Sequence, residues 1–196
     1  MSDSSSLALA TRRRYRHQMT SVTIRAATRS DVTGIAAVMR ESMLSLGRRV
    51  YDERQIASAL LYIARPDEQL IDDGTYFVAT EDEDIVGCGG WSRRRKVYSG
   101  SAAAGDESAL IDPTTEPARI RAMFVRPEHA RRGIGRRILQ HAEEHAEAEG
   151  FHSFQLVAMR SAGGIYEAAG YRSIGDSPIT LEDGVVLDCT LMEKSL

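Results

Sequence analysis

Hydrophobic residues follow strand and helix periods along most of the chain from residue 21 onward. The stretch 22–25 alternates apolar and polar residues, which predicts a first strand. Thr28 and Asp31 have the spacing of a capping box, and the apolar positions behind them recur at helical spacing, which predicts a helix. A second helix is predicted over 52–64, with Pro66 just past its end.

The rest of the chain alternates strands with helices. Two strands, 75–80 and 85–91, flank the acidic turn 81–84 and form a predicted hairpin. After a stretch without any visible period from Ser92 to about Pro117, the pattern predicts a strand over 118–126, a helix over 133–149, a strand over 153–159, a short helix over 162–169 and strands near 171–174 and 185–192. This order predicts one α/β domain over residues 21–196, whose middle strands are buried on both faces. The aperiodic stretch is longer than loops in compact domains usually are, so it is either functional or mobile.

Composition narrows the class of protein. The 196 residues, 42% of them apolar, are enough for one domain with a core. Lys and Arg number 25 against 28 Asp and Glu, so the chain offers no overall positive charge to nucleic acid or a membrane. Residues 1–20 are rich in Ser and Arg without a period, and we expect a disordered, solvated basic tail there rather than a nucleic-acid arm. Its arginines stand where the apolar part of a signal peptide would lie, which favours a cytoplasmic protein.

The segment 119–139 carries the most informative chemistry. An apolar strand ends at Val125, a turn follows at Pro127, and Gly133-Ile134-Gly135 opens an amphipathic helix. Glycines at a helix start let a ligand approach the backbone, and the free N–H groups of the first turn attract an anion such as a phosphate. Cations are unfavourable at this positive end of a helix unless an anion binds there, yet four arginines gather here: Arg131, Arg132, Arg136 and Arg137. The segment lacks the endings of a P-loop and of a dinucleotide fingerprint, so neither of those sites is predicted.

Ala130-Arg-Arg-Gly-Ile-Gly135 resembles the acyl-CoA signature Gln/Arg-x-x-Gly-x-Gly/Ala of the GNAT superfamily of N-acetyltransferases, with Ala130 in place of the first Gln or Arg. The order of elements resembles that family over residues 21–193. The resemblance implies a mixed, mostly antiparallel central sheet of about seven strands with helices on both faces. It also implies that acetyl-CoA is the co-substrate. Its pantetheine arm would lie along Met123, Phe124 and Val125, and its diphosphate on the backbone of Arg131, Arg132, Gly133, Ile134, Gly135 and Arg136.

A second motif, Tyr166-Glu-Ala-Ala-Gly-Tyr171, resembles the Tyr-Glu-x-x-Gly-Phe/Tyr ending of the same family. The resemblance places the Tyr166 hydroxyl beside the thioester sulfur, where it protonates the departing thiolate. Relatives often carry an Asn a few residues earlier to hold the CoA arm, and here Ser161 stands in its place. They also often carry a glutamate base where this chain has Arg119. Glu116 is the nearest carboxylate and our candidate base, with a chain of water molecules as the alternative.

Together the motifs predict an N-acetyltransferase that moves an acetyl group from acetyl-CoA to a primary amine of a small molecule or peptide by direct attack. A non-catalytic acyl-CoA-binding sensor that acts through a protein partner is the alternative, and Arg119 in the place of a glutamate keeps it open. The sequence does not identify the acceptor. The oligomeric state also stays open, although homodimers are common in the family. We expect no nucleic acid or membrane partner.

Other patterns in the chain have simpler interpretations. His141-Ala-Glu-Glu-His145 spells the H-x-x-E-H pattern of some metalloproteases, but no obvious third ligand follows, so a chance match is favoured and no metal is expected. Cys88 and Cys189 are too few and too far apart for a disulfide framework, and Cys88 is expected to be a small strand residue rather than a nucleophile. The basic residues 93–96 predict a solvated loop. Trp91 either lines an acceptor pocket or fills the core.

Overall fold

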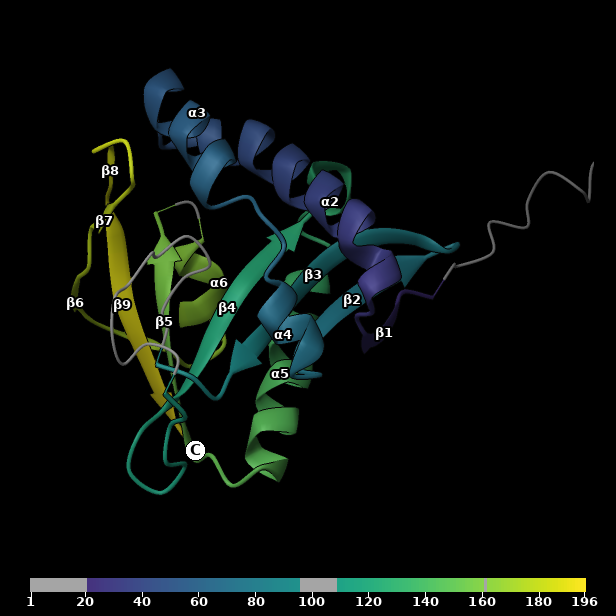
Figure 1. The fold of residues 1–196 in the computed structure, drawn as a ribbon, viewed down its shortest axis with the longest axis vertical. Coiled ribbons are helices and arrows are strands. Elements are labelled where there is room, and N and C mark those ends of the chain that lie inside the picture. The colour runs from purple at the N-terminus through teal and green to yellow at the C-terminus, as the bar shows by residue number, and fades with distance from the viewer. Residues whose placement is uncertain (1–20, 96–108, 161) are drawn as a thin grey trace, which may run out of the picture.

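A seven-stranded sheet runs through the protein in the spatial order β1-β2-β3-β4-β5-β9-β6 (Figure 1). This computed structural model describes residues 21–95, 109–160 and 162–196. The strands of the sheet are β1 Thr23–Ala26, β2 Tyr76–Glu81, β3 Asp84–Ser92, β4 Ala118–Val125, β5 Ser153–Met159, β6 Arg172–Asp176 and β9 Cys189–Ser195. Neighbouring strands are antiparallel, except that β4 and β5 run parallel. The mixed, mostly antiparallel sheet expected from the sequence is confirmed.

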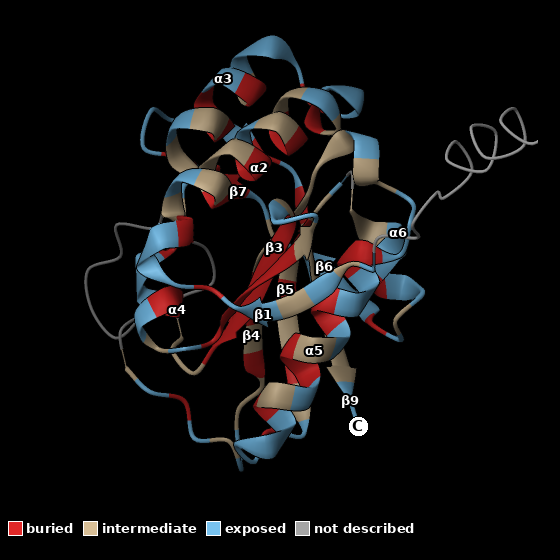
Figure 2. Cartoon of the chain, turned by 90° about the vertical axis from the view of Figure 1, so that its right-hand side faces the viewer, coloured by how far each residue is buried: buried red, intermediate tan, exposed pale blue. Residues whose placement is uncertain are grey.

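Helices cover both faces of this sheet. One face carries α2 (Val32–Ser45), α3 (Glu53–Tyr62) and α4 (Glu68–Asp72), and the other carries α5 (Ile134–Ala148) and α6 (Gly163–Glu167). Successive residues of a strand point to opposite faces, so Val78 of β2 packs with α2 while Phe77 packs with α5. Figure 2 shows buried residues gathered on the central strands and on the inner sides of α2 and α5.

The predicted helical stripes form the core. On α2, the stripe is at most 2% exposed and consists of Ile35, Val38, Met39 and Met43. On α5, the stripe of Ile134, Ile138 and Ala142 is equally buried. The predicted capping box of Thr28 and Asp31 is present, and the Thr28 N–H donates to the Asp31 carboxylate at 2.8 Å. Periodicity alone therefore located these two helices and the sides that they bury.

Two short elements were not predicted. They are α4 and β7 (Ile179–Thr180), which pairs with β8 (Val186–Leu187), and both are too short to show a period. The strand expected over 185–192 is divided between β8 and β9. The predicted tail at 1–20, the segment 96–108 and Ser161 lie outside the described residues. No helix in the described ranges is long and apolar enough to cross a bilayer.

The parallel pair of strands separates along its length. β4 and β5 pair at Ala118 with Phe154 and at Arg119 with Gln155, where the recorded pairing ends. Figure 1 shows the two strands close together at their starts and spread apart toward their ends. Within β4, the register to β3 shifts around Ala122, whose φ is +53°. Such a bulge bends the strand and re-aims its backbone groups, so the far half of β4 turns away from β5.

Candidate functional site

A tight loop between β4 and α5 holds the glycines that the sequence singled out. Gly133 is the N-cap of α5 with φ +79°, and Arg131 has φ +65°. A left-handed backbone is easy for glycine but costs other residues about 1–2 kcal/mol. A Cβ added to Gly133 would meet no atom within 4 Å, so the space in front of the loop is open.

The backbone N–H groups of residues 131–136 find no carbonyl acceptor in the described part of the chain. The first helical hydrogen bond of α5 runs from Arg137 N to Gly133 O, at 3.0 Å. The first turn of a helix leaves such donors free, and the helix dipole makes this end positive. Left-handed residues in a turn gather successive N–H groups into an anion-binding concavity. The geometry of the loop therefore suits an anion.

Gly135 lies where three elements meet. An added Cβ there would lie 2.9 Å from Cδ1 of Ile165 in α6 and 3.5 Å from Cγ2 of Val125 at the end of β4. Glycine lets these elements pack closely, since any side chain would displace Ile165. The two sequence motifs, which are separate along the chain, are thus adjacent in the fold.

The end of β4 has one edge without a recorded strand partner. Phe124 pairs with Cys88 and Val125 with Gly87, both on β3, while the pairing with β5 stops at Arg119. A strand paired on one side presents N–H and C=O groups on the other, where an extended chain can add to it. An extended ligand arm would therefore fit along Met123 to Val125.

Tyr166 lies in α6 on the same side of the sheet as the anion loop. Its side chain is 7% exposed and packs edge-on against Tyr171, with ring centroids 5.9 Å apart. Burial raises the pKa of the Tyr166 hydroxyl well above its usual value. The phenol therefore stays protonated over the ordinary pH range and remains a hydrogen-bond donor.

Glu116 precedes β4, at the opposite end of the strand from Val125. It accepts hydrogen bonds from Arg95 at 2.8 and 3.2 Å, and this pairing lowers the pKa of the Glu116 carboxyl. Arg119, two residues into β4, donates to Gln155 of β5. Its guanidinium is largely buried, and burial lowers its pKa. The start of β4 thus holds a cation where a base was sought, and a carboxylate already paired with an arginine.

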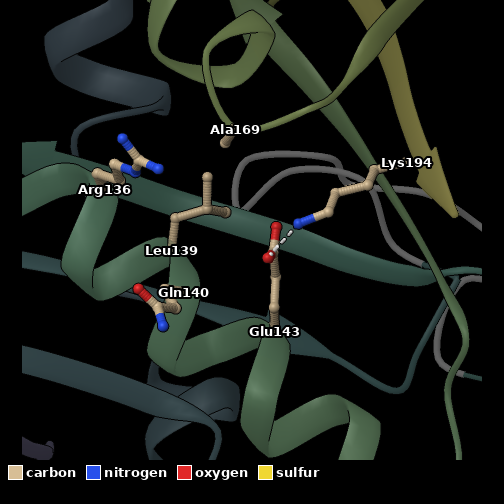
Figure 3. Close-up of a pocket in the computed structure, with 6 residues that line it drawn as sticks. All are labelled: Arg136, Leu139, Gln140, Glu143, Ala169 and Lys194. Carbon is tan, nitrogen blue, oxygen red and sulfur yellow. Dashed lines mark hydrogen bonds and ion pairs between the residues drawn. The ribbon is translucent and has the colours of Figure 1, made fainter. Parts of the chain in front are cut away.

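A pocket of about 310 Å³ lies along the flank of α5 beside Arg136 (Figure 3). Its lining mixes apolar and charged side chains, namely Arg136, Leu139, Gln140, Glu143, Ala169 and Lys194. Glu143 is satisfied on both oxygens, by Lys194 Nζ at 2.6 Å and by the Tyr171 hydroxyl at 2.9 Å. Arg136 has no carboxylate partner among the described residues, so its positive charge remains available to a ligand.

A sequence profile of the acetyltransferase (GNAT) family matches residues 40–171. The match spans more than half of the chain and includes β4, the glycine loop and Tyr166. The chain belongs to the GNAT family. It is therefore an acyltransferase, and the family resemblance drawn from the two motifs is confirmed.

Solved GNAT structures have the same fold. A GCN5-related N-acetyltransferase of Rhodopseudomonas palustris aligns with a TM-score of 0.67 at 22% identity, over 92% of this chain and 99% of that one. PaiA N-acetyltransferase of Thermoplasma acidophilum, solved with coenzyme A, aligns with a TM-score of 0.61 at 19% identity, over 90% of this chain and 99% of that one. A ribosomal-protein-alanine N-acetyltransferase of Brucella melitensis aligns with a TM-score of 0.58 at 18% identity, over 89% of this chain and 99% of that one. No curated protein matches this sequence.

In this GNAT protein the other sequence patterns have structural roles. No group of three metal-binding side chains occurs among the residues that the structure describes. His145 accepts a hydrogen bond from Trp91 Nε1 at 3.2 Å, and His141 packs edge-on against Phe77. Trp91 is fully buried and fills the core. Cys88 is also buried, which raises the pKa of its thiol to about 12 and makes it a poor nucleophile.

The basic stretch 93–95 is not the solvated loop that the sequence predicted. Its arginines are fixed by carboxylates from distant segments: Arg93 by Glu149, Arg94 by Asp73 and Arg95 by Glu116. These contacts join positions far apart in sequence, so no local pattern announces them. Lys96 lies outside the described ranges.

Sequence reasoning also missed Glu81, at the end of β2. Its carboxylate accepts from His129 Nε2 at 2.9 Å and from Arg132 Nη1 at 3.1 Å. Arg132, expected at the diphosphate, thus has its guanidinium on Glu81, while its backbone stays in the loop. The sequence predicted Glu81 as part of the acidic turn 81–84, whereas it lies in β2, and nothing local linked it to the glycine loop.

Proposed function

We propose that this protein transfers an acetyl group from acetyl-CoA to the primary amine of a small molecule or peptide by direct attack. The observation that carries the proposal is the row of backbone N–H groups at 131–136, which opens onto free space beside the end of β4. Several donors acting together stabilise the charge of a diphosphate. PaiA solved with coenzyme A and the YncA protein of Salmonella typhimurium solved with acetyl-CoA support this co-substrate.

In this proposal each part of acetyl-CoA has its own set of residues. The diphosphate binds the backbone of 131–136, and the pantetheine arm pairs with the open edge of β4 at Met123, Phe124 and Val125. The family resemblance assigns Ser161, which is outside the described residues, to the arm as well. The nucleotide end occupies the pocket beside Arg136, where Leu139 and Ala169 offer apolar surface and the guanidinium attracts the 3′-phosphate.

The chemistry follows from what amide formation requires. The amine has a reference pKa near 10, so it must lose a proton before its nitrogen attacks the thioester carbon. A backbone N–H of β4 stabilises the negative charge that gathers on the carbonyl oxygen, an effect worth a few kcal/mol. The carbon–sulfur bond then breaks. The buried Tyr166 hydroxyl donates its proton to the leaving sulfur, which departs as the CoA thiol, and the second proton of the attacking nitrogen passes through water to restore the phenol.

Glu116 is the proposed base, acting through water. Its ion pair with Arg95 keeps it ionised at neutral pH but also lowers its proton affinity. If Glu116→Gln retains the wild-type pH–rate profile, the water chain serves alone.

We place the reaction in the cytoplasm, because the buried Cys88 and Cys189 are both free thiols.

Isothermal titration calorimetry with desulfo-CoA tests the binding half of the proposal. Wild-type protein should bind it, and Gly135→Val should bind it more weakly, because the new side chain meets Ile165 and Val125 where the loop packs. Absence of heat with the wild type, or unchanged affinity in the variant, contradicts the diphosphate site. Gly74→Ala, at an open turn before β2, is the control variant.

Thiol release from acetyl-CoA, measured over a panel of amines, tests the catalytic half. The panel should include small diamines and peptides that begin with alanine, since the Brucella relative is a ribosomal-protein-alanine N-acetyltransferase. Turnover with any amine supports the proposal and begins to identify the acceptor. Tight CoA binding without turnover on any of them favours the sensor function instead.

The nucleotide part of the proposal has its own test. Arg136→Gln should weaken binding of CoA while leaving binding of dephospho-CoA unchanged, because only CoA carries the 3′-phosphate. Arg172→Gln, whose wild-type guanidinium pairs with Glu193 on the exposed edge of the sheet, is the matched control. Equal losses for both ligands would contradict the assignment of Arg136 to the 3′-phosphate.

A further inference from the structure

Glu81 contacts both sides of the left-handed residue in the anion loop. Its side chain is 12% exposed and lies at the end of β2. His129 Nε2 lies 2.9 Å from one carboxylate oxygen, and Arg132 binds both oxygens, at 3.1 and 2.5 Å. Since the carboxylate is an acceptor, His129 must carry its proton on Nε2. Glu81 therefore connects His129 with Arg132, which lie on either side of Arg131 in the chain.

The residue held between these two contacts is strained. Arg131 has φ +65°, a conformation that non-glycine residues adopt at a cost and keep only where surrounding contacts impose it. Arg131 itself forms no ion pair in the described residues that would hold it there. The contacts of His129 and Arg132 with Glu81 are thus the visible restraint on this turn of the backbone.

We propose that Glu81 is a positioning residue for the CoA diphosphate: it touches no ligand, and through His129 and Arg132 it keeps the N–H groups of 131–136 aimed at one anion. This inference rests on the proposed function, because it assigns a support to the diphosphate site. A bidentate carboxylate–guanidinium pair suits the role, since it fixes orientation as well as distance.

The direction in which CoA affinity changes when Glu81 is neutralised distinguishes a positioning role from a purely electrostatic one. Glu81 carries a negative charge close to a site for an anion, so by charge alone its removal should tighten CoA binding. Its pairing also holds the Arg132 guanidinium, which would otherwise be free to attract phosphate. Both considerations predict a gain in affinity on neutralisation, whereas the positioning role predicts a loss.

The test compares Glu81→Gln with the wild type by calorimetry against three ligands: CoA, 3′,5′-ADP and pantetheine. Binding of CoA and of 3′,5′-ADP depends on the loop geometry, so both dissociation constants should rise about tenfold. The constant for pantetheine, which lacks the diphosphate, should not change. Glu149→Gln is the matched control, because it removes a carboxylate paired with Arg93 at the other end of α5 and should bind all three ligands as the wild type does.

A second variant keeps the test decisive if Glu81→Gln folds poorly. His129→Leu removes the partner of Glu81 in one of its contacts and should weaken CoA binding, as Glu81→Gln does. The double variant should lose no more affinity than the larger single loss, because both changes release the same restraint. Unchanged or tighter CoA binding, or an equal loss for pantetheine, overturns the role of Glu81. If the wild type itself binds no CoA, the proposed function fails together with this inference.

Discussion

Gly133 and Gly184 allow the anion site to be tested against a matched backbone position. Both glycines have φ +79°, and a Cβ added to either would meet no atom within 4 Å. Gly133 caps α5 at the anion loop, whereas Gly184 lies in the turn between β7 and β8. Replacing each with alanine therefore introduces the same strain and no collision. The two variants differ only in whether the new methyl stands at the proposed diphosphate.

The stability cost of each variant follows from the backbone. Placing alanine in the left-handed region costs about 1–2 kcal/mol. For a chain of this length, each kcal/mol lowers the melting temperature by about 2–4 °C, so both variants should melt about 2–8 °C below the wild type. The affinity cost should appear in Gly133→Ala alone. Losing one hydrogen bond to a charged phosphate oxygen is worth about 1.5–3 kcal/mol, or roughly 10- to 150-fold in the dissociation constant of CoA.

Thermal melts and calorimetric titration with CoA at constant salt measure both quantities. Similar melting temperatures with selective loss of CoA affinity in Gly133→Ala would support the site. The reasoning is refuted if Gly133→Ala binds CoA as tightly as the wild type. It is equally refuted if Gly184→Ala loses the same affinity, since the effect would then be a general consequence of lower stability.

Three further predictions follow from other parts of the structure. Tyr166→Phe should lower kcat about 100-fold in the thiol-release assay and leave KM for acetyl-CoA unchanged, because the hydroxyl acts on the leaving sulfur; an unchanged kcat removes it from that role. Asp67→Asn should destabilise the protein by about 3–5 kcal/mol in urea denaturation, because it removes the carboxylate that faces the buried Arg121 guanidinium; a loss below 1 kcal/mol would contradict this. The Asp31 carboxyl has a lowered pKa in the folded state because Arg25 hydrogen-bonds to it. The ionised carboxylate therefore stabilises the fold above its unfolded pKa of about 4. This stability is lost as the pH falls toward the folded pKa. Asp31→Asn should therefore flatten the acid limb of a stability–pH curve below pH 4, and an unaltered limb would count against it.

The family could be identified from the sequence because its signature is local. This signature consists of the glycines at 133 and 135 and the tyrosine motif at 166–171. Each part acts through nearby backbone, so its residue spacing can be recognised in one sequence. The burial of α2 and α5 was equally readable, since each helix repeats its apolar positions within a few residues. The short elements α4 and β7 have too few residues for a period and were not found.

The contacts of Glu81 were not readable from the sequence. Glu81 meets His129 and Arg132 only after β2 and the loop before α5 are brought together by the sheet. The arginines at 93–95 were expected in solvent for the same reason, because their carboxylate partners lie in other segments. A side chain's partner depends on which segments the fold places beside it, and charge patterns along the chain carry no record of that.

The sequence by itself determined that this is an α/β chain of the GNAT family, and it predicted an anion site at the start of one helix, since those features depend on periodicity and on a backbone freed by glycine. The tertiary structure decided where β4 leaves β5, how Gly135 brings α6 to the end of β4, and which carboxylate pairs with His129 and Arg132. These are contacts between residues remote in sequence, and packing of the whole sheet and its helices sets their geometry.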